Sequence, residues 1–221
     1  MITCFTGTGG TGKSLDAASI IYQTLTITDE NVIANFAVNY DIVKYGWKQY
    51  KKYRDDKSFV PTPQIKKSSG HFYYVDNQYL SPDFLYSFAA KFHVPRRESQ
   101  TLVVLDECQN DKLFGNRSWN NKNRQDWCHF FEVHRHFGFD IILIAPSIKL
   151  IDKAIQYDIE YEDVHRKLSR FGWRGRIVQL LSGGCQFAAI RIWRTIGEKE
   201  SSRLFRYSEM YSEFYDSFRN F

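Results

Sequence analysis

The stretch Gly7-Thr8-Gly9-Gly10-Thr11-Gly12-Lys13-Ser14 matches the pattern G-x-x-x-x-G-K-[ST] of a Walker A phosphate-binding loop. Its glycines allow successive backbone N–H groups to turn inward around a phosphate, because no Cβ atom obstructs the turn. We expect every residue of this stretch, and Leu15 after it, to bind a nucleotide. Lys13 is expected to contact the β- and γ-phosphates, and Ser14 to bind the Mg²⁺ that accompanies them.

The flanking sequence favours this interpretation over a glycine-rich turn that only joins two elements. Residues 1–5 are an apolar, strand-like run, and apolar residues recur at helical spacing between Ser14 and Leu25. A strand, a loop and a helix in this order place the positive end of the helix dipole at the phosphates. We therefore expect an α/β fold of the P-loop NTPase class, with a mainly parallel sheet flanked by helices.

A second motif lies at the end of another strand-like run, Thr101–Leu105. Two acids, Asp106 and Glu107, follow this run directly and complete a Walker B pattern. We expect Asp106 to bind Mg²⁺, directly or through water, and Glu107 to act as the general base toward the attacking water. A glutamate after the aspartate is typical of ATPases with an extra strand between the two motif strands, so ATP is the expected nucleotide. Gln109 either orients the attacking water or is simply exposed to solvent.

Composition sets the broad class of the chain. Its 221 residues, 43% of them hydrophobic, suffice for one domain, which we place at 1–221 with a core at 1–157 and an extension at 158–221. A net charge of +5 is too weak alone to indicate nucleic acid. The four cysteines lack C-x-x-C spacing, and no apolar run approaches the ~20 residues that span a bilayer. We expect a soluble, cytoplasmic chain.

Local patterns predict the remaining elements up to the end of the core. Strands are expected at Val32–Phe36, His71–Val75 and Asp140–Ile144. Helices are expected at Tyr40–Tyr53, Pro82–Phe92, Arg124–Phe137 and Ser147–Gln156, and surface loops at Lys57–Ser69 and Asn110–Asn123. Ser81 is a favourable cap for the second of these helices, and Gly138 a favourable stop for the third.

The extension has a different pattern. Strands are expected at Ile159–Val164, Arg176–Leu181 and Gln186–Trp193, joined by glycine turns as an antiparallel meander, before a terminal amphipathic helix at Ser202–Phe218. We favour docking of this helix on the core over a partner interface. The densest basic stretch consists of Arg166, Lys167, Arg170, Arg174 and Arg176, with Phe171 and Trp173 interleaved. It suits single-stranded DNA, anionic lipid or, as the favoured interpretation, a solvated hairpin edge.

Three segments together resemble the zonular occludens toxin family, which includes the assembly ATPases of filamentous phages. They are the Walker A loop, Asp106-Glu107-Cys108-Gln109, and His134-Arg135-His136-Phe137-Gly138-Phe139-Asp140-Ile141. The last matches the family pattern H-R-H-x-G-x-D-I, which is more diagnostic than the Walker motifs, and the resemblance covers nearly the whole chain. It implies an ATP-hydrolysing motor that powers virion assembly and extrusion at the cytoplasmic face of the host inner membrane. A DNA translocase or packaging ATPase of the FtsK–HerA kind is the alternative function.

The resemblance also bears on partners and on further site residues. It implies a homo-oligomeric ring, with a hexamer as one candidate size, and phage assembly proteins as partners. Arg135 is then a candidate catalytic arginine acting on a neighbouring subunit, or else a helix arginine paired with Glu132 or solvated. Full-length members carry a transmembrane helix after this domain, and we expect membrane association only through that segment. The family's Thr-Gln sensor is replaced by Ala145-Pro146-Ser147, which leaves Ser147 as the substitute.

Overall fold

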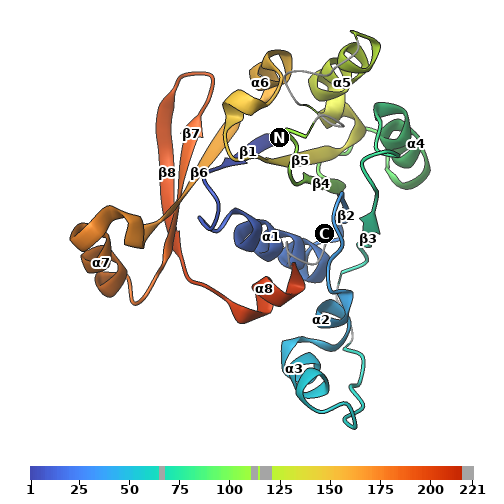
Figure 1. Ribbon diagram of the computed structural model, residues 1–221. Coiled ribbons are helices and arrows are strands. Elements are labelled where there is room, and N and C mark those ends of the chain that lie inside the picture. Colours follow the sequence, from blue (N-terminus) through green and yellow to red (C-terminus); the bar gives the residue numbers. More distant parts are fainter. Residues whose placement is uncertain (65–67, 111–113, 115–120, 216–221) are drawn as a thin grey trace.

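The computed structural model describes residues 1–64, 68–110, 114 and 121–215 (Figure 1). Its centre is an eight-stranded sheet with the strand order β3-β2-β4-β5-β1-β6-β7-β8. The strands are β1 (Ile2–Thr6), β2 (Asn31–Ala34), β3 (Phe72–Tyr74), β4 (Thr101–Leu105), β5 (Phe139–Ile144), β6 (Tyr161–Lys167), β7 (Phe187–Trp193) and β8 (Glu198–Phe205). The expected α/β class is confirmed, with parallel pairing from β3 through β6 and antiparallel pairing from β6 to β8.

The two motif strands occupy the middle of the sheet. β1 and β4 are buried along their whole length, which explains their nearly continuous apolar sequences. β5 pairs with both of them and therefore lies between them. This is the extra strand that the position of Glu107 predicted. Both motifs follow their strands directly, so both lie at the carboxyl edge of the sheet.

Helices cover both faces of the sheet, as Figure 1 shows. The helices of the described ranges are α1 (Lys13–Ile27), α2 (Tyr40–Tyr45), α3 (Trp47–Asp55), α4 (Pro82–Phe92), α5 (Asn121–Val133), α6 (Lys153–Asp158), α7 (Gly172–Leu181) and α8 (Glu209–Phe214). One hydrophobic core joins the sheet to α1, α2 and α8, and a second joins it to α4, α5 and α6. Within the described ranges, no helix is long and apolar enough to cross a membrane.

Most local predictions up to the end of the core are confirmed. Helix α4 has the predicted bounds, and the side chain of Ser81 accepts the N–H of Phe84. Gly138 adopts the left-handed conformation, with φ 80°, after a 3-10 turn that ends α5. The single helix expected at Tyr40–Tyr53 is instead two helices, because Gly46 between them has φ 73°. The loop expected at Asn110–Asn123 lies mostly outside the described residues, and α5 begins inside it.

The predictions for the extension need three corrections. Arg176–Leu181 is part of helix α7 and not a strand, so the basic stretch is not a hairpin edge. The third antiparallel strand is β8, which the sequence analysis missed. The terminal helix begins at Glu209 and not at Ser202, and its predicted end at Phe218 lies outside the described residues. The helix does dock on the core as expected, since Phe214 is completely buried.

Candidate functional site

The glycine-rich loop connects β1 to α1 and depends on backbone conformations that favour glycine. Gly7, Gly10 and Gly12 have φ values of 138°, 71° and 94°. The loop is anchored where it begins, because the N–H of Gly7 donates to the carbonyl of Pro146 at 3.2 Å. Helix α1 begins after Gly12 without a side-chain cap, which leaves its first N–H groups suited to an anion.

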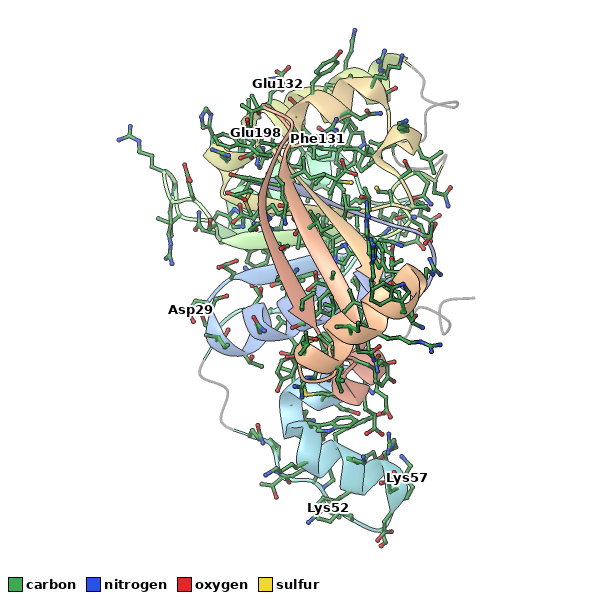
Figure 2. The ribbon with its side chains drawn as sticks, turned by 90° about the vertical axis from the view of Figure 1, so that its left-hand side faces the viewer. Asp29, Lys52, Lys57, Phe131, Glu132 and Glu198 are labelled. Carbon is green, nitrogen blue, oxygen red and sulfur yellow. The ribbon has the colours of Figure 1, made fainter. Side chains whose placement is uncertain are left out.

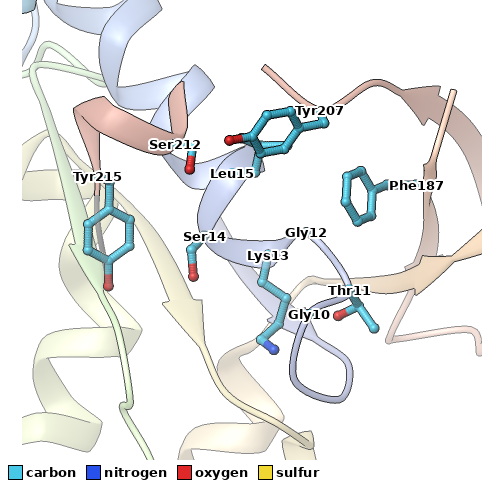
Figure 3. A pocket seen from close by; sticks show the side chains of 10 residues that line it. All are labelled: Gly10, Thr11, Gly12, Lys13, Ser14, Leu15, Phe187, Tyr207, Ser212 and Tyr215. Atoms are coloured by element: carbon cyan, nitrogen blue, oxygen red, sulfur yellow. The ribbon is translucent and has the colours of Figure 1, made fainter. Parts of the chain in front are cut away.

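A pocket of about 250 Å³ opens over this loop (Figure 3). It is lined by Gly10, Thr11, Gly12, Lys13, Ser14, Leu15, Phe187, Tyr207, Ser212 and Tyr215. The ammonium group of Lys13 folds back onto the loop and donates to the carbonyl of Gly7 at 2.7 Å. Burial lowers the pKa of Lys13, while the charges of Asp106 and Glu107 oppose this shift. The charges of both acids of the second motif therefore act on the cation of the Walker A loop.

Asp106 is oriented by four hydrogen bonds. Its Oδ1 accepts the N–H of Glu107 at 2.8 Å, and its Oδ2 accepts the phenol of Tyr215. Asn35, just after β2, binds the backbone N–H and carbonyl of Asp106 through its side chain, both at 2.8 Å. Burial raises the pKa of Asp106, so a nearby cation favours its ionised form. The partly buried carboxylate of Asp106 and the hydroxyl of Ser14 supply oxygen atoms of the kind that Mg²⁺ prefers as ligands.

Glu107 has a strained backbone. Its φ of 51° is uncommon for a residue other than glycine, and such strain often occurs at functional sites. Its side chain is exposed, and its Oε2 accepts a hydrogen bond from the side-chain amide of Gln109. The buried Oε1 of Gln109 has no partner among the described residues. That carbonyl can accept a hydrogen bond from a water molecule beside Glu107, which supports the orienting role over simple solvent exposure.

Arg135 lies at the opposite edge of the sheet from the two motifs. Its guanidinium pairs with Glu160 and not with Glu132, the partner named in the alternative to a catalytic role. Glu160 precedes β6 and binds the N–H of Ile2 at 3.0 Å, so this cluster lies at the amino edge of the strands. The five residues of β1, at ~3.3 Å each, separate the two edges by about 17 Å. Arg135 is therefore not part of the nucleotide pocket of its own subunit.

Two neighbours of the Walker A loop were not predicted as site residues. Arg170 donates to the hydroxyl of Thr8 and, at 2.9 Å, to the carbonyl of Gly9. Tyr215, which lines the pocket, stacks on Phe36 with ring centroids 4.0 Å apart while its phenol binds Asp106. No local pattern marks either residue. Asn35 did carry a signal, because a polar residue at the carboxyl end of a parallel strand is typical of a binding site.

A buried ionic cluster ties the first turn of α1 to the extension. Asp16 accepts hydrogen bonds from His165 in β6, at 2.8 Å, and from Arg203 in β8, at 2.6 Å. Asp16 and His165 are almost completely buried. Both ring nitrogens of His165 lie near oxygen atoms, since Nδ1 is 2.9 Å from the carbonyl of Asp163 and Nε2 is 2.8 Å from the carboxylate of Asp16. The helix that begins at the Walker A loop is therefore fixed by the last strands of the sheet.

Residues outside the Walker motifs that bear on the family resemblance have local structural contacts. Ser147 caps the 3-10 turn after β5 by accepting the N–H of Lys149 at 3.4 Å. His134 is buried, and its Nδ1 lies 2.6 Å from the carbonyl of Phe131. Cys4 and Cys108 are buried in the core, where they pack as small apolar residues.

Comparison with known proteins identifies the family to which the chain is similar. The family model for zonular occludens toxin (Zot) matches residues 1–186. The gene 1 protein of Salmonella phage IKe is 38% identical over 90 residues, which are 38% of this chain and 23% of that protein. The chain thus matches about a quarter of the length of this relative.

Two solved structures share the fold at low sequence identity. The N-terminal domain of zonular occludens toxin from Neisseria meningitidis aligns over 97% of this chain and 98% of its own, with a TM-score of 0.54 and 15% identity. B204, the DNA-packaging ATPase from Sulfolobus turreted icosahedral virus, aligns over 94% and 98%, with a TM-score of 0.53 and 11% identity. With the Zot model matching most of its length, this chain belongs to the zonular occludens toxin family.

Proposed function

We propose that this chain binds ATP with Mg²⁺ and hydrolyses ATP to ADP and phosphate. The observation that carries the proposal is the convergence of the two motifs at the carboxyl edge of the sheet. Lys13, which lines the pocket, is influenced by the charges of both Asp106 and Glu107. Tyr215 links the pocket to Asp106, because its side chain lines the pocket and its phenol donates a hydrogen bond to Asp106.

Each residue has a defined task in this reaction. The backbone N–H groups from Gly7 to Leu15 hold the phosphates, and Lys13 exchanges its contact with the Gly7 carbonyl for phosphate oxygens. Ser14 and Asp106 would hold Mg²⁺, which when bound offsets phosphate charge. Gln109 and Glu107 orient water toward the γ-phosphorus. As the water oxygen bonds to phosphorus and ADP leaves, Glu107 accepts the proton of the water.

Turnover and binding assays with two variants test this assignment. Glu107→Gln keeps the shape of the side chain and removes the base, so we expect ATP binding with hydrolysis about 10²–10⁴ times slower. Lys13→Ala should lose nucleotide binding or turnover while the circular dichroism spectrum is retained. Lys153→Ala, which changes an exposed lysine of α6, is the matched control. Unchanged binding and turnover in both site variants would contradict the proposal.

We further propose that this activity powers assembly and extrusion of a filamentous phage at the cytoplasmic face of the inner membrane. Membership of the zonular occludens toxin family and the match to a phage gene 1 protein support this role. The motor would act as a homo-oligomeric ring with phage assembly proteins as partners. Specific ATPase activity should then increase with protein concentration, because association completes the shared sites. Specific activity that is independent of concentration would contradict the ring.

A DNA translocase remains the alternative function. The fold shared with B204 does not decide between the two, because an identity of 11% supports only a common fold. Stimulation of ATP hydrolysis by DNA separates them. A translocase is expected to accelerate when DNA is added, whereas the proposed extrusion motor is expected to retain its basal rate.

A further inference from the structure

Helix α7 and the 3-10 turn before it, Leu168–Phe171, connect β6 to β7 and project from the end of the sheet (Figure 1). In Figure 2 the β7–β8 hairpin crosses the face turned to the viewer, with Glu198 at one end and α7 at the other. The helix packs on the turn through Gly175, which is buried. A Cβ atom there would lie 1.9 Å from the carbonyl of Leu168. The inner face of α7 is therefore the face of Gly175.

The opposite face of α7 is apolar and points to solvent. Trp173, Ile177 and Leu180 follow one another at spacings of four and three residues, which aligns them on one side of a helix. Gly175 lies on the other side. Trp173 and Leu180 are 68% and 80% exposed, and Leu181 beside them is 81% exposed. A contiguous group of large exposed apolar side chains marks an interaction surface more often than single exposed residues do.

Positive charge surrounds this apolar face. Arg174 and Arg176 lie on its two flanks. Arg174 is rotated by about 100° from Trp173 in one direction, and Arg176 by about 100° from Ile177 in the other. No acidic residue occurs between Val164 and Gly197. In the described part of the chain, neither Arg174 nor Arg176 forms an ion pair. The surface thus combines an apolar centre with an uncompensated positive rim.

We propose that α7 binds the surface of an anionic lipid bilayer. Trp173, Ile177 and Leu180 would enter the boundary between headgroups and acyl chains, while Arg174 and Arg176 contact lipid phosphates. Charge complementarity selects an anionic partner. Only one of the three central side chains is aromatic, and the aliphatic Ile177 and Leu180 offer no ring on which a base could stack, which favours lipid over single-stranded nucleic acid. This surface is separate from the ATP pocket, so the proposal does not depend on hydrolysis.

Vesicle cosedimentation of the 221-residue chain tests the apolar part of the surface. The wild-type chain should sediment with phosphatidylcholine vesicles that contain phosphatidylglycerol, and not with phosphatidylcholine alone. The double variant Trp173→Ser/Leu180→Ser should bind the anionic vesicles at least about tenfold more weakly. The control Val60→Ser/Tyr157→Ser removes two apolar side chains that are 83% and 90% exposed elsewhere, and should bind normally. Thermal unfolding is expected to be similar in all three proteins.

A second pair of variants tests the charge. Arg174→Gln/Arg176→Gln should weaken binding to the anionic vesicles about thirtyfold, because each cation near such a surface increases the affinity about fivefold. The control Lys48→Gln/Lys153→Gln removes the same charge from exposed positions on other helices and should have little effect. Added salt should weaken binding of the wild-type chain.

Three outcomes would overturn the proposal. The first is no binding of the folded wild-type chain to anionic vesicles. The second is binding to a single-stranded oligonucleotide that the α7 variants lose while vesicle binding is unaffected. The third is an oligomer, formed without lipid, that Trp173→Ser/Leu180→Ser dissociates, since the apolar face would then be a subunit interface.

Discussion

Replacing Gly7 by alanine tests how the tertiary structure supports the Walker A loop. A Cβ atom at Gly7 would lie 2.5 Å from the carbonyl oxygen of His165 and 2.8 Å from the hydroxyl of Thr11. The first contact cannot be relieved by a side-chain rotation, because it is with the backbone of the buried residue His165 in β6. The φ of 138° adds strain of about 1–3 kcal/mol, and overpacking adds about 1–3 kcal/mol. We expect the free energy of unfolding to fall by about 2–6 kcal/mol.

Gly9→Ala is the matched control in the same loop. No heavy atom lies within 4 Å of a Cβ atom placed there. Its φ is not positive, so we expect a change within about 0.5 kcal/mol. Urea unfolding without nucleotide, followed by the fluorescence of the five tryptophans, measures both values. Equal unfolding free energies for the two variants would refute the inference that the close approach of the His165 carbonyl requires glycine at position 7.

Three further predictions concern the ionic cluster, the metal site and the subunit contact. Burial raises the pKa of Asp16, but the hydrogen bonds from its two basic partners outweigh it and hold the pKa below the ordinary 3.8. The stabilisation is therefore present above pH 3.8 and lost as pH falls through the folded-state value, so Asp16→Asn should flatten this acid limb in pH-dependent unfolding. An unchanged acid limb would exclude the cluster as its source. Tyr215→Phe removes the donor that orients Asp106 and should weaken Mn²⁺ binding, measured by titration, about tenfold or more. Unaltered Mn²⁺ affinity would show that the phenol does not position the carboxylate. Mixing Arg135→Ala with Glu107→Gln subunits should restore part of the ATPase activity if the arginine acts on a neighbouring subunit, because a mixed interface holds one intact site. If mixing restores no ATPase activity, Arg135 does not act on a neighbouring subunit and is a structural residue.

Local sequence signals predicted the elements whose residues are determined mainly by their neighbours in the chain. The Walker A loop requires glycine conformations, α4 begins at a serine cap, and β4 is buried on both faces. Local signals were not sufficient at Arg176–Leu181. The β-branched pair Ile177-Val178 between glycines favoured a strand, whereas the structure has helix α7, whose close contact with Leu168 requires Gly175. Short apolar runs do not distinguish the two states by periodicity.

β8 is a second element that local sequence signals did not predict, here a strand that was missed. Glu198–Phe205 is exposed and mostly polar, so it lacks the alternating pattern of a half-buried strand. Its conformation comes from pairing with β7 along the edge of the sheet. This tertiary contact overrides the weak helical spacing that the sequence analysis extended back to Ser202.

The sequence by itself determined the class of fold and the family and located the two motifs of the candidate site, because the residues of each motif are adjacent in the chain. Only the tertiary structure decided how the site is completed. Asn35 and Tyr215 reach Asp106, and Arg170 reaches the Walker A loop, from segments far away in the chain. The tertiary structure also separated Arg135 from the pocket and exposed the apolar face of α7. Such relations depend on which strand ends meet at one edge of the sheet, and local residue patterns do not encode that packing.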